Sequence, residues 1–176
     1  MTMQFRDLAQ QAASDGVITN EWSDFFVEAL GEFVVNGTEP RGYVDESQAV
    51  WLVERVDHDG KCESLTELEL LVRVIEKALN VPQNLKDYVL KVIEQAVLTG
   101  EGPTRAGGSF DKGCVSAAEA ALLRRVIFAQ AGDKPAAVSQ HEAEMLFRLK
   151  DATLAANNSP EWKRLFVQGV GNFLQG

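Results

Sequence analysis

The chain has 176 residues, of which 45% are hydrophobic and 24% are charged, a mix that is ordinary for globular proteins and excludes a disordered or collagen-like chain. This length predicts one domain, or two small ones, and a core large enough to fold without a metal ion or disulfide. The longest unbroken hydrophobic run has five residues, Ala49 to Val53, so we expect no membrane insertion. The first seven residues contain no apolar signal core.

The net charge of −9 is unevenly distributed. Residues 1–100 contain 18 acidic and 8 basic side chains, whereas residues 101–176 contain 8 acidic and 9 basic ones. Binding to nucleic acid through phosphates requires clustered lysine and arginine, so the acidic first half argues against a nucleic-acid partner. The same charge favours a cation or a basic partner.

Hydrophobic residues recur at helical spacing almost throughout, and no long stretch alternates with a period of two. Four helix starts carry a capping-box pattern, in which a Ser or Asp is followed three positions later by Glu or Gln; they begin at Asp45, Ser64, Ser116 and Ser139. We therefore predict an all-α protein without significant sheet, with about eight short helices near residues 3–13, 19–36, 45–56, 64–79, 83–99, 116–130, 139–155 and 159–175. We expect Trp22, Trp51 and Trp162 to anchor the core of this helical array.

The turn between the third and fourth predicted helices is acidic, and it resembles the helix–loop–helix layout of an EF-hand. A calcium loop requires oxygen ligands at positions 1, 3 and 5, glycine at position 6 and glutamate at position 12. If Gly60 is position 6, then Thr66 occupies position 12; if Asp57 is position 1, then Lys61 occupies position 5. Neither register predicts a high-affinity calcium loop.

Two interpretations of this turn remain open. Its acidic side chains can stabilise the N-terminus of the following helix through the helix dipole. Alternatively, they form a looser divalent-cation site, whose ligands would be Asp57, Asp59, Glu63 and Glu67. No other cofactor is indicated, because the two histidines (His58 and His141) and two cysteines lack the ligand spacing of a zinc site.

The cysteines, Cys62 and Cys114, do not form a disulfide framework and fit a reducing cytoplasm. Both precede a predicted helix start, and we expect them to be small buried hydrophobic residues.

The longest irregular stretch, residues 100–113, is rich in glycine and contains Arg105. Backbone amides and an arginine can bind phosphate, but the spacing of a phosphate-binding P-loop is absent. We expect this stretch to connect two lobes, about 1–99 and about 114–176, of a single helical domain spanning 1–176.

The lobes resemble each other in sequence, which predicts an internal duplication. Residues 67–74 share two glutamates, a leucine and an arginine with residues 142–149, so that helices three to five would correspond to helices six to eight. A competing register matches residues 59–75 to residues 111–127 at 9 of 17 positions. Loop lengths favour the three-helix unit, in which the first two helices form a partial third copy.

Two helix starts carry an Asp–Gly pair followed by a hydrophobic residue and a glutamate: Asp15-Gly16-Val17-Ile18 through Glu21, and Asp59-Gly60-Lys61-Cys62 through Glu67. In an all-helical repeat chain, this pattern resembles the tellurite-resistance B (TerB-like) family. The resemblance implies a compact bacterial cytoplasmic protein of the metal or stress response that holds a metal through acidic loops. It implies no enzyme activity.

The sequence contains a duplication but no recognisable arrangement of catalytic residues. Our first hypothesis is therefore a non-enzymatic cytoplasmic binding or scaffold module with a protein partner. The second is a divalent-cation sensor that uses the acidic turn. The third is an enzyme that acts on a phosphorylated or cationic small molecule at a site without a known motif. A homo-oligomer remains open.

Overall fold

The computed structural model describes residues 20–58, 60–105, 112–129 and 137–175. These contain the helices α2 (Asn20–Asn36), α3 (Glu46–Val56), α4 (Leu65–Lys77), α5 (Gln83–Thr99), α6 (Ala117–Ile127), α7 (Gln140–Ala152) and α8 (Pro160–Gln175), with the two-residue strands β1 (Asp57–His58) and β2 (Lys61–Cys62). The all-α prediction is confirmed, and each of these helices lies where a helix was expected. The helix predicted at 3–13 lies outside the described residues.

Most of the described helices begin where a side chain satisfies one of their first backbone amides, whereas α5 begins after Pro82 without a side-chain cap. Asp45, Ser116 and Ser139 form complete capping boxes with the residue three positions later. At α8, the Ser159 hydroxyl accepts a hydrogen bond from the amide of Trp162 (3.3 Å). The helix ends were harder to predict: α6 and α7 stop about three residues earlier than expected, which is the ordinary error of boundaries inferred from a periodic pattern.

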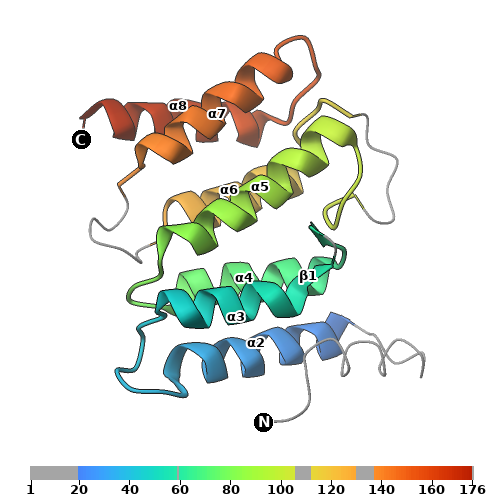
Figure 1. Cartoon of the computed structure of the whole chain (residues 1–176). Coiled ribbons are helices and arrows are strands. Elements are labelled where there is room, and N and C mark those ends of the chain that lie inside the picture. Colours follow the sequence, from blue (N-terminus) through green and yellow to red (C-terminus); the bar gives the residue numbers. More distant parts are fainter. Residues whose placement is uncertain (1–19, 59, 106–111, 130–136, 176) are drawn as a thin grey trace.

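The helices are stacked in successive layers, with α2 at one end, followed by α3 and α4, then α5 and α6, then α7 and α8 (Figure 1). Each helix from α2 to α6 packs on the helix two places further along the chain. A continuous cluster of buried hydrophobic side chains connects helices on both sides of residues 100–113. Among the described residues, no helix is both long and apolar enough to cross a membrane.

One packing relation recurs along the array. Arg73 of α4 forms an ion pair with Glu28 of α2 (2.7 Å), and Arg148 of α7 forms one with Glu94 of α5 (2.9 Å). In the three-helix register, α4 corresponds to α7 and α2 corresponds to α5. Under the predicted duplication, the two ion pairs would join corresponding helices.

The three tryptophans differ in burial. Trp162 is 3% exposed and lies in the core, and Trp22 stacks on Phe26 at the edge of the core. Trp51 is 36% exposed, with the Arg55 guanidinium 5.0 Å from its ring centroid. The prediction that Trp51 anchors the core is wrong, because α3 turns a different face, which includes Leu52, toward the core.

Candidate binding groove

The acidic turn folds as a β-hairpin that is attached to α5. Strands β1 and β2 pair antiparallel, and Gly60 between them has a φ of 82°, a backbone conformation that favours glycine. Asp57 accepts one hydrogen bond from the Gly60 amide and another from the Tyr88 hydroxyl, both 2.7 Å long. Asp57 therefore both closes the turn and connects it to α5.

A groove with a volume of about 750 Å³ lies between this hairpin, one face of α5 and the segment that follows α5. The apolar wall of the groove is formed by Tyr88, Val92 and Pro103, together with the buried Cys62. Its exposed lining residues include two of each charge, Lys61, Lys91, Glu63 and Glu101. Such a combination of apolar surface and a few polar groups is typical of ligand-binding sites.

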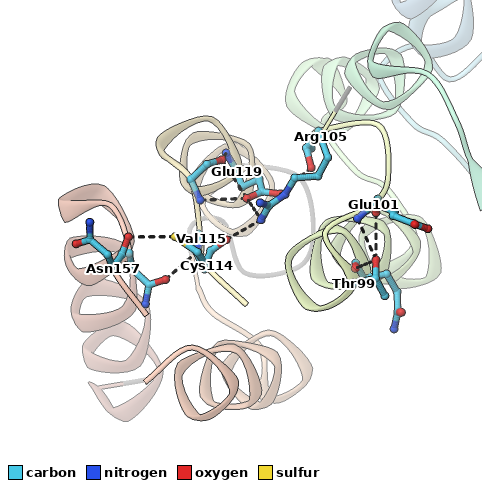
Figure 2. Close-up of polar contacts among 11 residues, drawn as sticks. Thr99, Glu101, Arg105, Cys114, Val115, Glu119 and Asn157 are labelled. Atoms are coloured by element: carbon cyan, nitrogen blue, oxygen red, sulfur yellow. Dashed lines mark hydrogen bonds and ion pairs between the residues drawn. The ribbon is translucent and has the colours of Figure 1, made fainter. Parts of the chain in front are cut away.

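The far end of the groove is shaped by the turn that ends α5. Gly100 caps the helix in a left-handed conformation (φ 77°). The Thr99 hydroxyl donates to the Gln95 carbonyl and accepts a hydrogen bond from the Glu101 amide (3.2 Å), and the contact between Thr99 and Glu101 is visible in Figure 2. These bonds direct the chain back along α5 toward Pro103, which is buried.

Two titratable groups in the groove have shifted pKa values. Burial, and secondarily the charge of Glu67, raises the pKa of the Cys62 thiol to about 12. Burial also raises the pKa of Tyr88, and its hydrogen bond to Asp57 adds to this effect. At neutral pH both groups keep their protons, so neither is a ready nucleophile or base.

The four residues predicted as metal ligands have different surroundings. Asp57 is engaged by its two hydrogen bonds, Glu63 is exposed, and Glu67 is 9% exposed in the first turn of α4. In the part of the chain that the structure describes, no three His, Cys, Asp or Glu side chains are grouped to hold a metal ion. Asp59 lies outside the described residues, so the four-residue site remains a prediction.

Arg105, in the glycine-rich connection, is held by several hydrogen bonds. Its guanidinium, which is 6% exposed, bonds both carboxylate oxygens of Glu119 (2.8 and 2.9 Å) and the Cys114 carbonyl (2.6 Å) (Figure 2). Thr104 donates a further hydrogen bond to Glu119 (2.7 Å). These bonds attach the described end of this segment to the start of α6.

The two cysteines are unlike each other. Cys62 is 4% exposed, as expected, whereas Cys114 is only half-buried and its thiol donates to the Asn157 carbonyl (3.0 Å). The prediction that Cys114 is buried is therefore wrong. His141 lies exposed in the first turn of α7.

Two functional features were missed from the sequence. Tyr88 belongs to an apolar helical face, and its hydroxyl in an otherwise aliphatic stretch was the only signal that it bonds a polar partner. Glu119 was expected only as a capping residue, although its carboxylate also forms an ion pair with Arg105.

Comparisons with known proteins add no assignment: no protein-family model, curated protein or solved structure matches this chain.

Proposed function

We propose that this chain is a non-enzymatic helical binding module, and that the groove between the β1–β2 hairpin and α5 holds a short segment of a protein partner. The observation that carries this proposal is the lining of the groove. It combines an apolar surface with side chains of both charges, and its two pKa-shifted groups, Cys62 and Tyr88, stay protonated at neutral pH.

The charges favour a polar peptide over a purely hydrophobic ligand. Lys61 and Lys91 can pair with acidic groups of a partner, and Glu63 and Glu101 can pair with basic ones. Between these charged side chains, Val92 and the ring of Tyr88 form an apolar surface. Burial of a partner side chain on this surface would contribute most of the affinity.

Capture from a lysate of the source cells tests the proposal. The wild-type chain and two variants would serve as bait: Val92→Arg, which places a charge in the groove, and Leu154→Arg, which places one at a residue that is 75% exposed and outside the groove lining. We expect a partner that the wild type and Leu154→Arg capture and Val92→Arg does not. Equal capture by all three would place the partner elsewhere, and repeated failure of the wild type to capture any partner would refute the proposal.

The second candidate function is the cation sensor, which the TerB resemblance also implies. It is supported by the position of Asp57 and Glu63 on the same groove. Its test is thermal unfolding with and without metal, described below.

A further inference from the structure

A row of apolar side chains lies on the outer side of α2, at the end of the helical stack. The row, here called the α2 stripe, consists of Phe25, Ala29 and Phe33, which are spaced four residues apart and therefore lie along one side of the helix. All three are exposed, Phe25 by 71% and Phe33 by 49%. Exposed aromatic residues in a contiguous row are typical of an interaction surface.

The corresponding stripe on α5 is less exposed. In the three-helix register, the positions of Phe25, Ala29 and Phe33 are those of Tyr88, Val92 and Ala96 on α5. There Ala96 is buried and the other two are half-buried. Asp57 bonds Tyr88, Gly102 lies beside Ala96, and Tyr88 and Val92 line the groove. The hairpin and the segment after α5 thus shield on α5 part of the stripe that α2 leaves exposed, and the four-residue spacing of the α2 stripe suits the apolar face of another helix.

The charges on α2 indicate which kind of helix fits. All four of its charged residues are acidic: Glu21, Asp24, Glu28 and Glu32. Arg73 and Lys77 of α4 pair with Glu28 and Glu32, whereas Glu21 and Asp24 lie exposed near Phe25 in the first two turns. Pairing α2 with α2 of a second copy would bring acidic side chains together, and a helix carrying lysine or arginine would complement them.

We propose that the α2 stripe is a docking site for an amphipathic helix of another protein, with basic residues flanking its apolar face. This proposal does not depend on the groove.

Designed peptides test the proposal directly. Two peptides of about 18 residues, or five helical turns, would carry the same leucine stripe and differ only in having lysine or glutamate beside it. Binding would be measured by fluorescence anisotropy at low salt. We expect the lysine peptide to bind the wild type at least tenfold more tightly than the glutamate peptide does, and Glu21→Lys with Asp24→Lys to reverse that preference.

A matched pair of variants separates the α2 stripe from general attraction to an acidic protein. Phe25→Ser with Phe33→Ser should lower the affinity for the lysine peptide at least tenfold, whereas Val167→Ser with Leu174→Ser, at exposed residues of α8, should leave it unchanged. Circular dichroism would check that both variants remain folded.

Two results would overturn the proposal. The first is equal affinity of the lysine peptide for the wild type and the Phe25/Phe33 variant. The second is a wild-type dimer in sedimentation velocity that the Phe25/Phe33 variant breaks, because the occupant of the stripe would then be a second copy of this chain.

Discussion

The segments that precede α4 and α6 start from similar sequences and fold differently. Residues 59–75 and 111–127 share 9 of 17 residues, including a cysteine, the N-cap serine and the glutamate three positions after it. Ser64 and Ser116 both cap their helices. Before α4, however, the chain forms a hairpin beside an open groove, whereas before α6 a buried arginine bonds the capping glutamate.

The difference shows that the cap motif determines where a helix begins but does not determine the conformation of the chain that precedes it. Arg105 lies nine residues before Cys114, outside the similar segment, and it pairs with the buried Glu119 at the start of α6. Tyr88, which follows α4, has the corresponding role at the hairpin, since its hydroxyl bonds Asp57. A hollow of about 670 Å³ also lies beside the segment before α6, but Arg105 on its lining is engaged by Glu119. We therefore regard the segment before α6 as structural and propose the hairpin before α4 as the segment that binds.

Removal of Arg105 should give the largest loss of stability. Arg105→Met leaves the carboxylate of Glu119, which is fully buried, without its cation. Breaking a buried ion pair in this way costs about 3–5 kcal/mol of unfolding free energy, which urea denaturation would measure.

Two further variants test the cause. Arg105→Met with Glu119→Gln removes the buried charge and should recover part of the loss. Arg41→Met breaks an ion pair with Glu39 in which both side chains are highly exposed, so it should leave the unfolding midpoint almost unchanged. If Arg105→Met were as stable as the wild type, the connection would lack the structural role that we assign to it.

Alkaline pH should weaken the hairpin region through Cys62. The pKa of this thiol is raised in the folded state from 9.0 to about 12, so the folded state holds a proton that the unfolded state releases. The resulting stabilisation is complete below pH 9 and is lost as the pH rises toward 12. The slope contributed by this one thiol is about −1.4 kcal/mol per pH unit.

Urea unfolding of the wild type and of Cys62→Ala between pH 8 and 11 would measure this contribution. The variant should have a shallower decline in stability, although some decline remains because the pKa of Tyr88 is raised as well. The same slope for both proteins would contradict the burial of the Cys62 thiol.

Loss of the Tyr88 hydroxyl should have a smaller effect. Tyr88→Phe removes the hydrogen bond to Asp57, and a half-buried bond to a carboxylate contributes about 1–2 kcal/mol. The chain has only two tyrosines, and the second, Tyr43, is 48% exposed, so Tyr43→Phe is the matched control and should be nearly neutral. Equal costs for the two variants would show that the bond does not stabilise the hairpin.

Local sequence patterns predicted the helices and most of their starts, because apolar periodicity and capping act within a few residues. Contacts between distant residues could not be predicted in the same way. Arg105 and Glu119 are separated by 14 positions, and Tyr88 and Asp57 by 31, and many other polar partners were available to each. Burial of single residues also depends on packing: Trp51 and Cys114 are apolar enough for a core, yet both are partly exposed. The groove arises from such contacts and therefore appears only in the folded chain.

The smallest effect is expected from divalent cations. After treatment with EDTA, addition of calcium, magnesium, manganese or zinc should change the thermal midpoint by less than about 2 °C, because the oxygens of Asp57 already accept hydrogen bonds from Gly60 and Tyr88. A ligand at 100 times its Kd would add about 2.7 kcal/mol, or about 5–10 °C for a chain of this size.

A shift of that size would support the cation sensor if it disappeared in Asp59→Ala with Glu67→Ala and persisted in Glu39→Ala with Glu46→Ala, which removes the same charge at exposed sites. Because a cation bound to Asp57 would compete with the Tyr88 hydroxyl, Tyr88→Phe should then increase the shift. Without a bound cation, Tyr88→Phe lowers the midpoint by the same amount with metal and with EDTA. The response of this one variant therefore decides whether the hairpin owes its shape to a metal ion or to its hydrogen bond with α5.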